Sequence, residues 1–232
     1  VWTLGPTVAI IFVFLFISFS NLIAWYNKNK NMNKTFLIGI PIRDFVNPMS
    51  RLSNLLTPSE RIDLAKNLIL NLVNAFSDEE TSIYIISNSP EVELFCKLNN
   101  LNNFQSQKQG LNEEVKEFIN AVDNHNYWTI VHGDLPYITK YFAKTISQEI
   151  EGSEILIAKS KDSGTPFIAG TVSFDEFTFG VKSFDKHSKY LKENKYEYKQ
   201  IFSTEFTFEL DDENDYQKFL LNQPRWFKKL TI

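Results

Sequence analysis

The sequence predicts an α/β domain of three layers, with helices on both faces of a mostly parallel sheet. Short apolar runs that are typical of buried strands alternate along the chain with longer stretches of helical periodicity. The chain has 232 residues, which is enough for one sizeable core. Its composition, 43% hydrophobic and 22% charged, is that of an ordinary globular protein and argues against a disordered chain.

The first half of the domain is predicted to open with a strand at Phe36–Ile42. The capping box Thr57-Pro58-Ser59-Glu60 then begins a helix over residues 58–76, whose apolar residues recur at helical spacing. The other elements of this half are apolar runs bounded by Asn, Ser, Pro and Gly. They are a strand at 82–87, a short helix at 90–98, a polar loop with a short strand at 99–109, and a helix at 113–122.

The second half continues the alternation of strands and helices. The predicted strands are 127–131, 154–158, 166–174 and 198–210, and the predicted helices are 138–150, 183–193 and 213–221. Ligands of a parallel sheet bind outside the carboxyl ends of its strands. The functional site is therefore expected among the residues that follow the strands.

Residues 1–31 form a separate hydrophobic segment. As a helix, Val8–Trp25 would span roughly 27 Å, close to the roughly 30 Å of a bilayer core. Lysines at positions 28, 30 and 34 would keep the rest of the chain in the cytoplasm by the positive-inside rule. Three interpretations stay open: an anchor that tethers the domain 32–232 to the inner face of the membrane through residues 8–25, a stretch upstream of a start at Met32, and a signal peptide.

Charge and cysteine content exclude several classes of function. The formal net charge of −4 argues against nucleic-acid binding, because a phosphate backbone requires a basic face. The single cysteine, Cys96, excludes an internal disulfide and every metal site with several cysteines. Cys96 itself is expected to be a small buried apolar residue.

Three carboxylates are candidates for a metal site. Asp134 ends the apolar strand in Val131-His132-Gly133-Asp134-Leu135-Pro136, and Glu209 and Asp211 end the predicted strand 198–210. Glu209 and Asp211 are two residues apart, so they would face the same side of an extended chain. Together the three could hold Mg²⁺ against a phosphate. The alternative for Asp134 and for Asp211 is a helix cap.

Basic and hydroxyl residues in other loops are candidates for binding anions. Arg43 and Arg51 lie in the loop before the helix 58–76, where guanidinium groups could bind phosphate oxygens or form surface ion pairs. The turns at 162–165 and 179–183 carry hydroxyl groups, and the second opens a helix, so it could bind an anion or only cap the helix. His125, His132 and His187 lack ligand spacing, and no metal role is assigned to them.

The ordered set of these motifs resembles the 2-phospholactate/phosphoenolpyruvate guanylyltransferase family of coenzyme F-420 biosynthesis. The match extends from about Phe36 to Leu220. The matching segments are Ile40-Pro41-Ile42-Arg43, Ser50-Arg51-Leu52-Ser53, Leu56-Thr57-Pro58-Ser59-Glu60-Arg61, Gly110-Leu111-Asn112, His132-Gly133-Asp134-Leu135-Pro136, Gly164-Thr165, Phe179-Gly180 to Ser183-Phe184, and Glu209-Leu210-Asp211.

The resemblance implies a fold like that of nucleotide-diphospho-sugar transferases, and a Mg²⁺-dependent reaction with GTP. The phosphate of a small phosphorylated acid would attack the α-phosphorus of GTP and release pyrophosphate. The implied residue roles follow the matching positions. Asp134, Glu209 and Asp211 would hold Mg²⁺; Arg43 and Arg51 would neutralise the triphosphate; Gly110 and Asn112 would lie near the guanine nucleotide; Thr165, Gly180 and Ser183 would hold the phosphorylated acid.

This chain departs from the family pattern at several positions. Arg43 stands where the family usually has Lys, Met49 replaces a Lys before Ser50, Glu209 replaces an Asp, and Pro166 replaces an Asn. The acceptor could be 2-phospholactate, phosphoenolpyruvate or 3-phosphoglycerate. Two other functions stay open: a related nucleotidyltransferase that loads a sugar phosphate or a molybdopterin, and a non-catalytic, membrane-tethered binding domain, which the loss of the cation at Met49 would favour.

Overall fold

The computed structural model describes residues 35–78, 80–122 and 125–227. The hydrophobic segment 1–31, with its predicted helix and membrane contact at residues 8–25, lies outside the described residues. Within them, no helix is both long enough and apolar enough to cross a bilayer.

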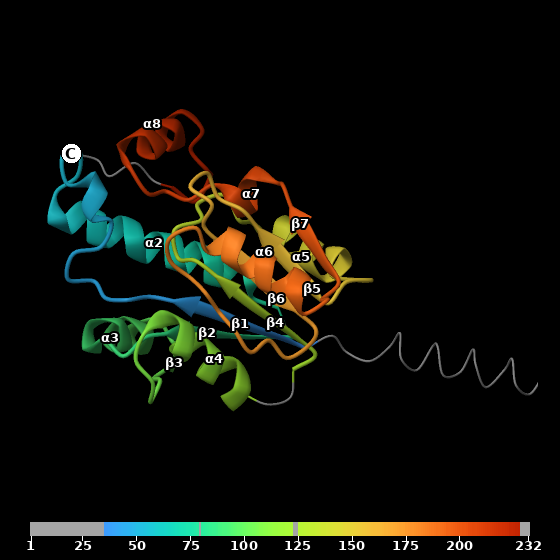
Figure 1. Cartoon of the computed structure of the whole chain (residues 1–232). Helices are drawn as coiled ribbons and strands as arrows, with labels where there is room; N and C mark the ends of the chain where they lie inside the picture. Colours follow the sequence, from blue (N-terminus) through green and yellow to red (C-terminus); the bar gives the residue numbers. More distant parts are fainter. Residues whose placement is uncertain (1–34, 79, 123–124, 228–232) are drawn as a thin grey trace, which may run out of the picture. The chain divides into compact units, whose positions relative to one another are not determined.

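Seven strands form the central sheet of the described domain, in the order β3-β2-β1-β4-β6-β5-β7 (Figure 1). β6 is antiparallel to both of its neighbours, and the other neighbouring pairs are parallel. The predicted α/β class with a mostly parallel sheet is therefore confirmed. The strands are β1 (Phe36–Pro41), β2 (Thr81–Ile86), β3 (Asn102–Phe104), β4 (Tyr127–Val131), β5 (Ile155–Ala158), β6 (Phe167–Gly170) and β7 (Tyr198–Ile201).

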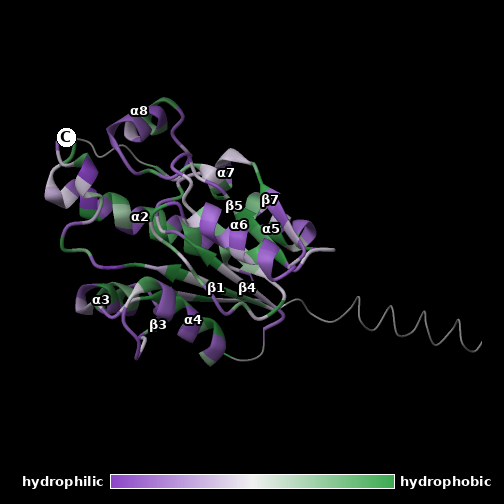
Figure 2. Ribbon diagram, viewed as in Figure 1, coloured by the Kyte–Doolittle hydropathy of each residue, from purple (hydrophilic) through white to green (hydrophobic). Residues whose placement is uncertain are grey.

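Helices cover both faces of this sheet and complete the three layers. Successive strand residues point to opposite faces, so Ile38 and Ile40 pack in one buried cluster and Leu37 in another. Figure 2 shows the hydrophobic strands lying between the helices. The first face is covered by α2 (Pro58–Phe76), α3 (Pro90–Leu98) and α5 (Lys140–Glu149), and the second by α4 (Leu111–Ala121) and α6 (Ser183–Glu193).

Local sequence signals predicted several elements to the residue. The capping box at the start of α2 forms as expected: the Thr57 hydroxyl accepts the Glu60 N–H at 3.3 Å, and the Glu60 carboxylate accepts the Thr57 N–H at 2.7 Å. The bounds of α3, α6, β4 and α8 (Glu213–Leu221) are also those predicted. α3 and α8 begin with side-chain caps at Ser89 and Asp212, which explains the agreement for these two helices.

The predicted strand 198–210 is wrong beyond Ile201. β7 ends there, and a short helix, α7 (Thr204–Thr207), follows. The alternation of apolar residues that suggested a strand has another cause, because these residues reach different partners. Phe206 is buried against Phe167, whereas Phe208 packs against Tyr137 and Phe202 is 80% exposed. Glu209 and Asp211 therefore lie in the loop between α7 and α8, not at a strand end.

The predicted strand 166–174 is shorter than expected, because β6 ends at Gly170. After that residue the chain turns so that the Val172 carbonyl accepts the Trp128 indole N–H at 2.8 Å. The reversed direction of β6 pairs Phe167 with Val131, at the carboxyl end of β4. The residues just before β6 therefore lie beside the residues just after β4.

Candidate active site

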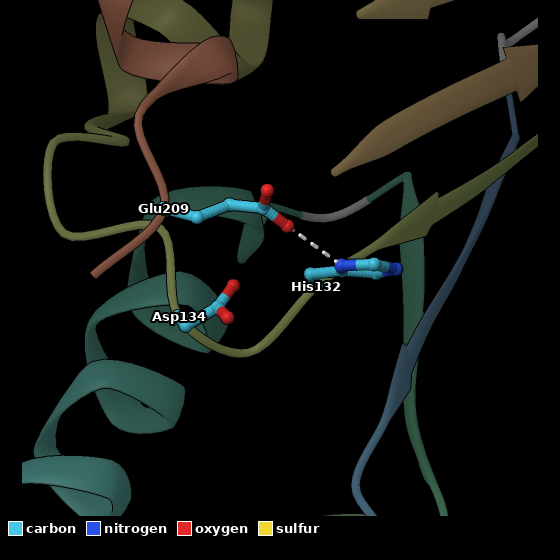
Figure 3. A group of neighbouring side chains, drawn as sticks. All are labelled: His132, Asp134 and Glu209. Atoms are coloured by element: carbon cyan, nitrogen blue, oxygen red, sulfur yellow. Dashed lines mark hydrogen bonds and ion pairs between the residues drawn. The ribbon is translucent and has the colours of Figure 1, made fainter. Parts of the chain in front are cut away.

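The end of β4 and the loop between α7 and α8 meet in a cluster of three side chains, His132, Asp134 and Glu209. The Leu210 N–H donates to the Asp134 carbonyl at 3.0 Å, which holds the loop against the segment after β4. His132 Nδ1 and Glu209 Oε1 lie 3.0 Å apart, and both carboxylates point toward the space beside the imidazole (Figure 3). One potential ligand atom from each residue lies within 4.8 Å of the others.

The electrostatics of this cluster fit a divalent cation. Burial, together with the negative charge of Glu209, raises the pKa of Asp134 to about 7. Asp134 Oδ1 is buried and has no hydrogen-bond partner among the described residues. Two crowded carboxylates and an imidazole form a ligand set that divalent metals accept, and a cation would offset the repulsion between the carboxylates.

His132 is a member of this cluster that the sequence analysis did not assign to a metal. Burial lowers the pKa of His132, but the hydrogen bond to Glu209 and the nearby charges of Asp134, Glu209 and Asp211 outweigh it, so the net shift is upward. The only sequence signal for its role was its position directly after β4, two residues before Asp134. Its partner Glu209 is 77 residues away in the chain, so no local ligand spacing exists.

Asp211 lies near this cluster but pairs with Arg51, whose Nη1 is 3.0 Å from Asp211 Oδ2. Arg51 belongs to the short 3-10 helix η1 (Ser50–Leu52), which packs next to α8. Burial, and then the charge of Glu209, raise the pKa of Asp211. The structure therefore brings together the predicted metal ligand Asp211 and the predicted phosphate ligand Arg51, and its three-residue metal group contains His132 in place of Asp211.

A buried carboxylate fixes the loop that carries Glu209 and Asp211. Asp215 accepts the N–H groups of Asp211 and Asp212, at 3.4 and 3.3 Å. Lys161 forms an ion pair with Asp215 and another, at 2.8 Å, with Asp212. Because the loop has no strand to hold it, its position depends on these contacts and on the bond from Leu210 to Asp134.

A cavity of about 900 Å³ opens at the carboxyl ends of β1, β2 and β4, as expected for this class of sheet. His132, Gly133 and Asp134 line it at the β4 end. Arg43 lines it from the loop after β1, and its side chain is 97% exposed. Gly110 lines it at the start of α4. The cavity has the size of a nucleotide site and lies against the metal-binding candidates.

The predicted ligands of the nucleotide and of the acceptor other than Gly110 do not line this cavity, and each makes hydrogen bonds within the fold. Asn112 holds the backbone of Phe179, since its Oδ1 accepts the Phe179 N–H at 2.7 Å. The fully buried Thr165 hydroxyl lies 3.0 Å from His187 Nδ1. The buried Ser183 opens α6 and donates its N–H to the carbonyl of Gly180, whose φ is +115°. Their predicted contacts with nucleotide and acceptor stay predictions.

Metal affinity is expected to decrease as the pH is lowered, because protons compete with the cation for the Asp134 carboxylate. With a pKa of about 7, a drop from pH 8 to pH 6 should weaken binding of Mg²⁺ or Mn²⁺ by about tenfold. Titration calorimetry at both pH values in two buffers of different ionisation enthalpy would measure the affinity and the protons released. An affinity independent of pH would contradict the role of Asp134 as a ligand.

Solved structures place the described domain in the nucleotidyltransferase fold class. A structure from Desulfovibrio desulfuricans G20, assigned as a nucleotide-diphospho-sugar transferase, has a TM-score of 0.72 at 13% identity and covers 84% of this chain and 91% of its own. A cytidylyltransferase from Leptospira borgpetersenii has a TM-score of 0.51 at 12% identity, and the match covers 87% of this chain and 99% of the other. At such identities the likeness concerns the fold alone.

Sequence comparisons identify the family. The family model described as "Guanylyl transferase CofC like" matches residues 36–225, so the chain belongs to this family. A 2-phospho-L-lactate guanylyltransferase from Methanocaldococcus infernus is 31% identical over 160 residues, 68% of this chain and 72% of the relative. Another 2-phospho-L-lactate guanylyltransferase, from Methanosphaera stadtmanae, is 28% identical over 199 residues, which are 82% of this chain and 86% of the relative. The resemblance inferred from the motifs is confirmed.

Proposed function

We propose that this protein transfers GMP from GTP to a small phosphorylated three-carbon acid and releases pyrophosphate, in coenzyme F-420 biosynthesis. The observation that carries the proposal is the family match over residues 36–225, which includes the cluster of His132, Asp134 and Glu209 at the cavity. The relatives' name makes 2-phospho-L-lactate the first acceptor to test, with phosphoenolpyruvate and 3-phosphoglycerate beside it.

In this reaction a phosphate oxygen of the acceptor forms a bond to the α-phosphorus of GTP, and the bond from the α-phosphorus to the bridging oxygen of the β-phosphate breaks. Asp134 and Glu209 would hold Mg²⁺, with Asp211 as a further ligand once it leaves Arg51. When bound, Mg²⁺ supplies positive charge against the phosphates. His132 orients the Glu209 carboxylate through Nδ1.

The basic residues would neutralise the leaving pyrophosphate. Arg43 lines the cavity from the loop after β1. Arg51 does not line it and is held beside it by the ion pair with Asp211. Positioning and charge neutralisation account for most of the catalysis of phosphoryl-group transfer. We keep Gly110 and Asn112 as nucleotide-side residues, and Thr165, Gly180 and Ser183 as acceptor-side residues, on the strength of the family motifs.

A cytoplasmic location is part of the proposal, because lysines at positions 28, 30 and 34 follow the hydrophobic segment. It predicts that the domain meets GTP and Mg²⁺ in the same compartment. Fractionation of cells that produce the full chain would test both the location and the tether.

The test is a pyrophosphate-release assay of the full chain with Mg²⁺, each nucleoside triphosphate in turn, and each candidate acceptor. We expect release that requires GTP and a three-carbon phospho-acid, with the guanylated acid identified by mass spectrometry. Release only with a sugar phosphate or a molybdopterin would assign a related transferase instead. No release with any pair would favour a non-catalytic binding domain.

A further inference from the structure

The cavity beside the metal cluster carries different charges at its two ends. In the sheet order, β1 lies between β2 and β4. At the β4 end are Asp134 and its proposed cation. The middle is lined by the ion pair of Arg43 and Asp44, which lie 3.5 Å apart in the loop after β1. At the β2 end, the charged residues that line the described cavity are two carboxylates, Glu91 and Glu114, each in the first turn of a helix.

This charge distribution fixes the direction in which a nucleotide can lie, provided that the proposed function is correct. A triphosphate is a polyanion, so it is repelled from the end with Glu91 and Glu114 and attracted toward the cation. Arg43 can add to this attraction where the triphosphate displaces Asp44 from it. Its base then occupies the β2 end, against the start of α3 and α4. The side chains at the β2 end of the cavity are therefore the ones that can contact the base and discriminate between bases.

Glu114 is held at the cavity wall in a fixed orientation. Its Oε1 accepts the N–H of Gly110 at 3.1 Å, and its side chain is half-buried. Gly110 has a φ of +95°, in the left-handed region that other residues rarely adopt. A carboxylate offers about four lone-pair positions, so Glu114 can accept further hydrogen bonds from a ligand while it keeps its bond to Gly110.

We propose that Glu114 accepts hydrogen bonds from the N1–H and 2-amino groups of guanine and so selects guanine nucleotides. Guanine presents these two donors side by side, which matches the two oxygens of a carboxylate. Adenine and cytosine instead present a ring-nitrogen lone pair at this edge, which a carboxylate repels. Uracil presents one donor between two carbonyl oxygens. Guanine is therefore the base that this wall favours.

Glu91 is the other acidic residue at this end, and its contacts point to a different role. It is exposed, and its carboxylate accepts, at 2.6 Å, the hydroxyl of Ser89, the serine that caps α3. That hydrogen bond lowers the pKa of Glu91. An exposed carboxylate competes with water for a ligand, so it discriminates less between bases than the half-buried Glu114.

The experiment compares binding of GDP and IDP, which differ only by the 2-amino group of the base. Calorimetry on the full chain with Mg²⁺ gives both affinities without depending on catalysis. We expect the wild-type protein to bind GDP at least about tenfold more tightly than IDP, the effect of one charge-assisted hydrogen bond. In Glu114→Gln the ratio should fall to within about threefold, mainly through weaker GDP binding. ADP should bind more weakly than IDP to the wild-type protein.

Two matched variants serve as controls. Glu113→Gln changes the neighbouring exposed residue on the same helix, which does not line this cavity, and should leave the ratio unchanged. Glu91→Gln should also leave it unchanged. The assignment is overturned if Glu114→Gln keeps the wild-type ratio, if Glu91→Gln loses it, or if the wild-type protein does not prefer GDP. The pyrophosphate assay decides the proposed transfer separately, since a protein could bind GDP through Glu114 and transfer nothing.

Discussion

Replacing Asp134 with asparagine is expected to lower turnover by about 1,000-fold or more while the domain stays folded. The carboxylate would be a ligand of the cation that neutralises the phosphates, and an amide is a much weaker ligand for Mg²⁺. Steady-state pyrophosphate release would measure the loss. Calorimetric titration with Mg²⁺ should show weaker metal binding in the same variant.

The same variant is expected to be at least as stable as the wild-type protein without metal. Burial and the charge of Glu209 raise the pKa of Asp134 to about 7, above its unfolded value. The folded state thus holds this proton more tightly, and the ionised carboxylate at pH 8 costs stability that asparagine does not. Asp175→Asn, at an exposed position, is the matched control for turnover. Near-normal turnover in Asp134→Asn would refute the metal assignment.

Asp215→Ala is expected to destabilise the domain by about 3 kcal/mol, because two N–H groups lose a buried acceptor and a charge-assisted bond to Lys161 is lost. Asp215 is buried, pairs with Lys161 and completes the capping box of α8, so its loss leaves the Asp211 and Asp212 N–H groups without their acceptor and leaves Lys161 with Asp212 alone. The expected fall in Tm is about 10 °C for a domain of this size. Thermal unfolding followed by circular dichroism would measure it.

The loop that Asp215 fixes also carries Glu209, so this variant should bind Mg²⁺ about tenfold more weakly. Asn214→Ala, at the exposed neighbouring position on α8, should change neither stability nor metal binding. A Tm within about 2 °C of the wild-type value in Asp215→Ala would show that the other contacts suffice to hold the loop.

Features encoded in neighbouring residues could be predicted from the sequence. The capping box at Thr57 and the break after Val131 each depend on a few adjacent residues, and both lie where expected. Asp134 was a candidate for the same reason. The family motifs supplied the order in which distant segments contribute to one domain, which periodicity alone does not give.

Features that depend on contacts between distant segments of the chain could not be predicted from the sequence. The strand predicted over 198–210 failed because Phe206 and Phe208 are apolar for packing against Phe167 and Tyr137, which the local pattern cannot distinguish from a sheet face. His132 acquires its role from Glu209, far along the chain. The antiparallel direction of β6 likewise depends on its neighbours in the sheet, and its four residues carry no sequence signal for it.

The ion pair between Arg51 and Asp211 has a thermodynamic consequence for the order of loading. A cation that draws Asp211 away releases the guanidinium, and a polyphosphate that draws Arg51 away releases the carboxylate. Each ligand thus removes a competitor of the other, and linkage makes the benefit equal in both directions. Because the pair is partly exposed, the cooperativity should not exceed about fivefold. Nucleotide and metal would then enter this protein most readily as a complex.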